Sequence, residues 1–302
     1  MTLLIDQFLA VLNILLPVLA VAGTGFFWAR SGRNYPTQEI TAFVTLIGTP
    51  CLLFHFLLIH EVQFFELVKF MAAVLAVISA VTIASYLILP IFGGDRKALT
   101  AAFSFPNVGN VGLPVCFLAF GAAGESYALI YFSVSAMLMH TIGRWAHQGE
   151  ASIITVLQSP VLWSVTATLG LIWWREQTGQ LLAPNWLMDA TKILGGMVIP
   201  IVLVSLGVSI SKLNISSLPR NLSLSATRFL LGLAIALVLV RLFRFEGVAA
   251  DIFILQTVMP IAVLNYMFAA MYNNQVKETA ALVMTSNLLA LITLPVVLWF
   301  MV

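Results

Sequence analysis

The chain has 302 residues, of which 61% are hydrophobic and only 9% are charged, and its formal net charge is +2. A soluble domain is about 45–50% apolar and about 25% charged, so this composition excludes a soluble fold, and so small a charge gives no indication of nucleic-acid binding. Because one transmembrane helix needs roughly 20 residues, the chain is long enough for ten spans with short connections.

Ten apolar segments follow one another along the chain. Those of the first half cover about residues 7–28, 39–59, 66–92, 96–120 and 125–145. The polar stretch 147–159 separates the two halves, and we expect the midpoint of the chain there. Those of the second half cover about residues 160–174, 189–210, 222–243, 248–272 and 279–301.

Three proline landmarks recur in the same order in the two halves, at a nearly constant spacing of about 150 residues. The pairs are Pro17 with Pro160, Pro50 with Pro200, and Pro106 with Pro260. Recurrence at a fixed offset indicates a duplicated unit. A unit of five spans, an odd number, must lie upside down relative to its copy. We therefore expect an all-α membrane protein made of two inverted five-helix repeats, residues 1–148 and 149–302.

The fourth segment contains FSFPNVGNVGLPVCFLAFG, from Phe103 to Gly121. Proline removes a backbone donor and clashes with the preceding turn, and glycine permits unusual backbone angles, so we expect an interruption from about Pro106 to Pro114. The ninth segment is expected to break at Met259-Pro260. Irregular backbone at membrane depth is tolerated only where protein buries it or a cavity adjoins it, and such breaks are typical of transporter binding sites.

Half-helices that start at a break expose unpaired N–H groups and partial positive charge. An anion can therefore be held there without a buried cation, which is costly in a membrane. The residues expected to bind substrate are Asn107, Gly109, Asn110, Gly112 and Asn265, and those expected at the crossing are Pro106, Pro114 and Pro260. The alternative for the asparagines is that they only cap the broken helix ends.

Ion coupling stays open at this stage. The candidates are Gln256, His55, His140 and Ser133. Histidine titrates near neutral pH and could carry a proton, while oxygen donors could bind Na⁺; a structural hydrogen bond is the alternative for each. No acidic residue lies clearly at mid-span, so facilitated diffusion, H⁺ coupling and Na⁺ coupling all remain. We expect no metal and no cofactor.

Catalysis is not expected. The chain lacks a His-Glu-x-x-His pair and paired mid-membrane aspartates, so we assign no catalytic residue and expect a protein that is not an enzyme.

Lysine and arginine predict the orientation. With the N-terminus outside, nine of the 14 basic residues lie at inner loops and span ends and five lie outside. The inner set is Arg30, Arg33, Arg96, Lys97, Arg144, Lys212, Arg220, Arg228 and Lys277, and the outer set is Lys69, Arg175, Lys192, Arg241 and Arg244. Both termini are therefore expected outside, in a plasma or inner membrane.

The segment Asn107-Val-Gly-Asn110-Val-Gly-Leu-Pro114 resembles the fourth span of the auxin efflux carrier family, and Val258-Met-Pro-Ile-Ala262 resembles its ninth. The resemblance implies a ten-span fold related to bile acid sodium symporters, in which broken spans 4 and 9 cross at mid-membrane. It also implies a small organic anion as substrate: auxin, a dicarboxylate or an amino acid.

The sequence thus predicts a secondary carrier that works by alternating access. The alternative is a channel or a non-transporting receptor for a small organic ligand. The expected partners are the organic anion, membrane lipid and a second copy of the chain in a homodimer, and no nucleic acid.

Overall fold

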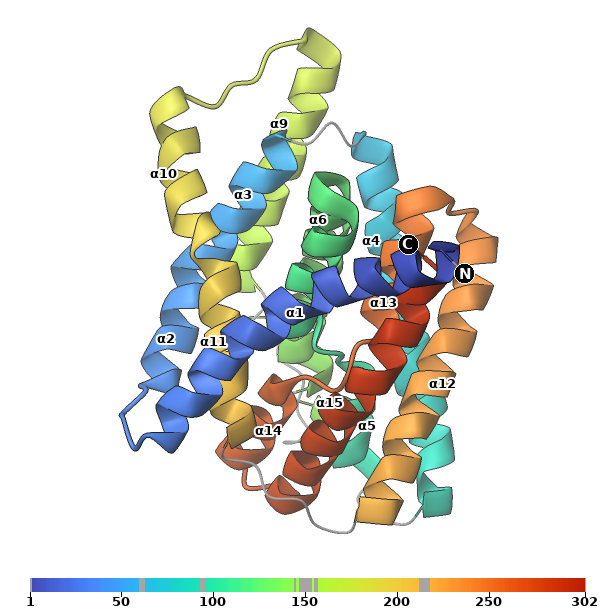
Figure 1. Cartoon of the computed structure of the whole chain (residues 1–302). Coiled ribbons are helices and arrows are strands. Elements are labelled where there is room, and N and C mark those ends of the chain that lie inside the picture. The colour runs from blue at the N-terminus through green and yellow to red at the C-terminus, as the bar shows by residue number, and fades with distance from the viewer. Residues whose placement is uncertain are drawn as a thin grey trace.

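The computed structural model describes residues 2–59, 63–92, 96–143, 145–146, 154, 157–211 and 218–301. Within these ranges the regular structure is helical, with no strand, and the helices pack into two groups (Figure 1).

The first group combines helices from both halves of the chain. Its members are α1 (Thr2–Arg30), α2 (Thr37–Phe43), the π-helical η1 (Val44–Gly48), α3 (Thr49–Ile59), α9 (Pro160–Thr178), α10 (Asn185–Gly196) and α11 (Val198–Ser211). Helix α1 packs along α11, and α3 packs against α9 and α10. Helices from the first half of the chain therefore pack directly against helices from the second half.

The second group contains the interrupted helices. Its members are α4 (Phe64–Ile88), η2 (Leu89–Phe92), α5 (Arg96–Ser104), the π-helical η3 (Val108–Gly112), α6 (Leu113–Leu138), η4 (Met139–Gly143), α12 (Leu218–Phe243), α13 (Gly247–Val258), α14 (Val263–Met271) and α15 (Val276–Trp299). Helix α12 packs against α4, α13 and α15, and α6 packs against α4 and α13.

Seven helices of the described chain are long and apolar enough to cross a membrane. Large apolar side chains remain exposed on them, such as Phe27, Ile83 and Ile292, and lipid would cover these. The expectation of an all-helical, multi-pass membrane protein is confirmed. The fourth and ninth expected spans are not single long helices because each is split by a break.

Two prolines follow π-helical turns. The N–H of Thr49 bonds the carbonyl of Val44, five residues back, immediately before Pro50. The N–H of Leu113 bonds the carbonyl of Val108 in the same way, immediately before Pro114. A proline ring crowds the preceding turn, and the wider π turn accommodates it.

This arrangement corrects the expected extent of the first break. The chain is already helical at Val108, so the interruption covers only Phe105 to Asn107, and Pro114 lies in helix α6 beyond it. The expected loop between the fourth and fifth spans is likewise only a kink, at Gly121, whose φ of 61° suits glycine.

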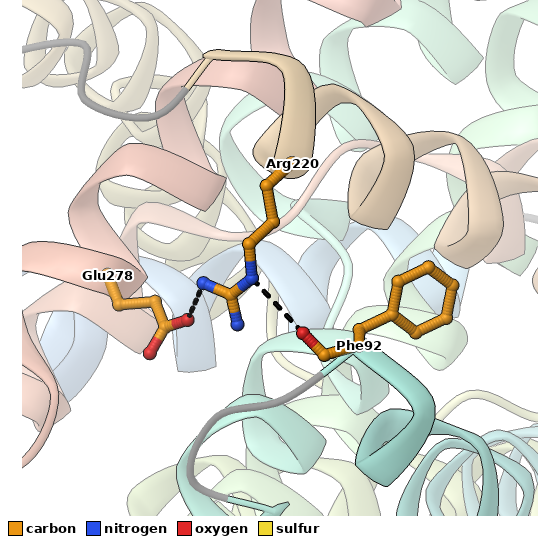
Figure 2. Close-up of polar contacts among 3 residues, drawn as sticks. All are labelled: Phe92, Arg220 and Glu278. Atoms are coloured by element: carbon orange, nitrogen blue, oxygen red, sulfur yellow. Dashed lines mark hydrogen bonds and ion pairs between the residues drawn. The ribbon is translucent and has the colours of Figure 1, made fainter.

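Arg220 joins three helix ends (Figure 2). From the first turn of α12, its Nε donates to the carbonyl of Phe92 at 3.2 Å, and its guanidinium forms an ion pair with Glu278 at the start of α15. The contact holds α12, α15 and the end of η2 together at one end of the second group.

Helices α1 and α11 touch through their backbones. A Cβ atom at Gly25 would overlap the carbonyl oxygen of Val204, and one at Gly207 would overlap that of Ala22. Small residues that allow such close approach are the usual means of helix association in membranes. Gly23, on the same helix α1, has no neighbour within 4 Å of a built Cβ.

We predict that Gly25→Ala and Gly207→Ala lower the melting temperature of the purified protein, because forcing two packed backbones apart costs typically about 1–3 kcal/mol. Gly23→Ala is the matched control and should leave the melting temperature unchanged or slightly raised, since alanine favours a helix over glycine. Equal melting of all three variants would contradict the backbone contact.

Candidate functional site

The two breaks meet and pair with each other. The N–H of Asn107 donates to the carbonyl of Pro260 at 2.6 Å, and the N–H of Ala262 donates to that of Phe105 at 3.2 Å. Pro106 lies opposite Ile261 as an antiparallel bridge. The backbone groups freed by one interruption thus find partners in the other, which meets the requirement for irregular backbone inside a membrane.

The four half-helices approach this crossing from two directions. Helices α5 and α13 end at it, whereas η3–α6 and α14 begin at it. Figure 1 shows α5 and α14 toward one end of the molecule and α6 and α13 toward the other, and the members of each pair pack together. One helix C-terminus and one N-terminus therefore reach the crossing from each end.

Polar side chains complete the pairing on the α14 side. The Nδ2 of Asn265 donates to Phe105 O at 3.0 Å and to Ala262 O at 3.2 Å. The Oγ of Ser286 accepts the N–H of Ile261 at 3.0 Å, and Asn287 donates to the carbonyl of Ile261 at 3.3 Å. Asn265 is fully buried, its Nδ2 supports the crossing, and it does not line the cavity described below.

Arg228 is the residue that sequence reasoning missed. It lies on α12, is only 3% exposed, and donates from NH1 to Met259 O at 2.7 Å and from Nε to Phe103 O at 3.4 Å. These carbonyls stand at the C-terminal ends of α13 and α5. Its assignment to an inner span end was therefore wrong. A signal was present, because Arg228 stands well inside the apolar run 222–243.

Arg228 also changes the electrostatics expected of the break. Helix C-termini carry partial negative charge and N-termini partial positive charge. The guanidinium bonds carbonyls at the negative ends of α5 and α13, while the N-terminal ends at Val108 and Val263 are not contacted by it. A buried cation is thus present at the crossing, contrary to expectation. It donates to the carbonyls at the C-terminal helix ends.

A cavity of about 160 Å³ adjoins the N-terminal ends, between the two helix groups. One wall comes from α2, η1, the start of α3, and α11, and the other from the first break, η3, α6 and the start of α14. Of the residues proposed from sequence, those that line it are Pro106, Asn107, Gly109 and Asn110. Those that do not are Gly112, Pro114, Ser133, Gln256, Pro260, Asn265 and His55.

The two motif asparagines present unused polar groups. The Nδ2 of Asn107 is buried without a partner, and Asn107 is 3% exposed. Asn110 lines the cavity one turn further. Between them Gly109 faces Phe132, whose ring would lie 2.9 Å from a Cβ built at that glycine. The motif therefore brings two amides to the cavity and uses its first glycine for packing.

The second motif glycine and the ion-coupling candidates lie elsewhere. Gly112 packs directly against Gln256, whose side-chain amide is buried without a partner. Ser133 donates to Leu129 O at 2.6 Å, and His55 is buried on α3. The side chain of His140 falls outside the described residues. Within the described chain no group of His, Cys, Asp and Glu could hold a metal ion.

Fold and site define a multi-pass helical membrane protein with two interrupted helices crossing beside a cavity. The sequence model of a family described as membrane transport protein matches residues 10–155 and 147–298. The chain belongs to this family, which contains the auxin efflux carriers. No match was found among curated proteins.

We predict that Arg228→Met strongly lowers the melting temperature, because two buried helix-end carbonyls lose their donor and each unpaired group costs about 1–3 kcal/mol. The melting temperature of Arg228→Lys should lie between those of Arg228→Met and the parent, since lysine keeps the charge but not the planar fork of donors. Arg241→Met is the control, an exposed arginine near the end of the same helix. If Arg228→Met melts like Arg241→Met, the guanidinium does not support the crossing.

Proposed function

We propose that the protein is a secondary carrier that moves a small organic anion across a plasma or inner membrane by alternating access. The observation that carries the proposal is the position of the cavity, which both helix groups line and which the N-terminal ends of two half-helices adjoin. A ligand held between two helix groups can be exposed to either side when one group moves against the other.

The charge of the ligand follows from the cavity wall. The described lining residues include no acidic side chain, and they include the amides of Asn107 and Asn110. Helix N-termini favour anions through their free N–H groups and the helix dipole. A carboxylate fits this environment better than a cation or a neutral group. Auxin-like acids, dicarboxylates and amino acids are the classes proposed, with coupling to Na⁺, H⁺ or neither.

A ten-span topology with two inverted repeats of residues 1–148 and 149–302 accompanies this proposal. Several observations support it: breaks at corresponding places in the two halves, Pro50 and Pro200 near the start of corresponding helices, and a family match in two segments that meet near residue 150. Each helix group draws on both halves, as pairs of inverted units would. A homodimer remains part of the proposal.

A transport protein of this family is not expected to act as an enzyme. The alternative functions are a channel and a non-transporting receptor. A carrier saturates and shows counterflow in proteoliposomes, whereas a channel shows no counterflow and a receptor moves nothing.

We predict that proteoliposomes take up a radiolabelled carboxylate from a panel of indole-3-acetate, succinate and alanine, with saturation and counterflow. For an acid that is transported, the matched amide should be transported far less, because the helix ends attract charge. Equal transport of acid and amide would overturn the anion assignment.

Asn110→Ala should weaken this transport about tenfold or more, since a hydrogen bond to a charged partner is worth about 1.5–3 kcal/mol. Its melting temperature should match that of the parent, because Asn110 reaches the cavity. Unchanged transport by Asn110→Ala would remove this residue from the site.

We also predict that both termini face outward. Removing Arg228 from the inner count leaves eight basic residues against five, which keeps the bias. Alkaline phosphatase fused after position 302 should be active in a bacterial host, and green fluorescent protein fused there should be dark. The same reporters fused at position 148 should give the opposite pattern, and an inactive phosphatase at the C-terminus would reverse the topology.

A further inference from the structure

Four threonines face the cavity from the wall opposite the break. Thr37 and Thr41 belong to α2, Thr45 to η1, and Thr49 starts α3; all four line the cavity. They stand four residues apart along one continuous helical run. Sequence reasoning did not single them out.

The π-helical turn explains how this spacing keeps one face. An α-helix has 3.6 residues per turn, so each four-residue step overshoots the turn. The π turn at Val44–Gly48 is wider, so a four-residue step there covers less than one full turn. This offsets the rotation that four-residue steps accumulate in the α-helical parts. Pro50 is the residue that this wider turn accommodates. The π turn therefore both accommodates Pro50 and keeps the four threonine side chains on the face that lines the cavity.

Several other helical threonines satisfy their hydroxyls within the helix, although the hydroxyl of Thr279 on α15 is buried without a partner. Thr82, Thr100, Thr166 and Thr168 each donate to the carbonyl one turn earlier, at 2.7–2.8 Å. Such a bond is the usual way to satisfy a helical threonine away from water.

In the row itself, Thr37 donates to Tyr35 O at 3.3 Å. Thr41, Thr45 and Thr49 make no hydrogen bond to any described residue, and Thr49 is only 2% exposed. Across the cavity the Nδ2 of Asn107 is buried and unpartnered. Threonines therefore line one wall of the cavity and asparagines the other, so a ligand between them would have polar groups on both sides.

Resting on the proposed function, we propose that Thr41, Thr45 and Thr49 form a second wall of the substrate site. Their hydroxyls donate hydrogen bonds to the carboxylate of the substrate from the first helix group, while Asn107 and Asn110 bind it from the second. The substrate thus bridges the two groups, so its occupancy favours the arrangement in which they face each other.

The test uses Thr41→Val, Thr45→Val and Thr49→Val, singly and together, because valine keeps the shape and removes the hydroxyl. Thr166→Val is the matched control: its hydroxyl bonds Leu162 O, and it lies on the exposed face of α9. Uptake of labelled indole-3-acetate, succinate and alanine is measured with KM and maximal rate separated, together with melting temperature.

The row variants should raise KM by roughly tenfold or more for the transported acid, while they melt at the parent temperature, because these three hydroxyls bond no described residue. A purely structural hydroxyl would instead lower the melting temperature and leave KM unchanged, and that result overturns the proposal. Parent-like KM in the triple variant means that the row faces only water, and the wall is then wrong while the carrier stands. If the parent transports none of the three probes, the proposed function fails and this wall fails with it.

Discussion

The architecture depends on one constraint: backbone groups released by an interrupted helix must find partners where water is absent. Phe105–Asn107 and Met259–Ala262 meet this constraint by pairing with each other, helped by Asn265 and Ser286. Neither interruption has these partners alone. The two halves of the chain are therefore joined at this point by backbone chemistry as well as by side-chain packing.

The crossing separates two kinds of helix end. Carbonyls at the C-terminal ends of α5 and α13 are held by Arg228, while the N-terminal ends at Val108 and Val263 adjoin the cavity. Arg228 thus occupies the side of the negative helix ends, and the cavity adjoins the ends that carry partial positive charge. This arrangement is the basis of the proposal that the substrate is an anion.

The helix groups differ in how they are held. Helices α1 and α11 are in backbone contact at Gly25 and Gly207, so they are expected to move as a unit. The crossing holds the second group together in the same way. The cavity lies at the junction between the groups, where its threonines and asparagines face one another. A relative movement of the groups would alter the cavity and leave each group intact.

Several features of this protein follow from the sequence alone, because they depend on local chemistry. Composition determines the membrane fold, and Pro106 and Pro260 mark the two interruptions because proline lacks a backbone donor. Proline alone does not identify them, because Pro17 and Pro295 lie inside helices. Asn107 and Asn110 reach the cavity because they adjoin the first interruption. The extent of that interruption was not predictable, since Pro114 is absorbed by a π turn. The positions of Arg228, of Gln256 against Gly112 and of the threonine row were decided only by tertiary structure. Each depends on residues from distant helices, and periodicity along one helix cannot show which neighbour its polar side chains will meet.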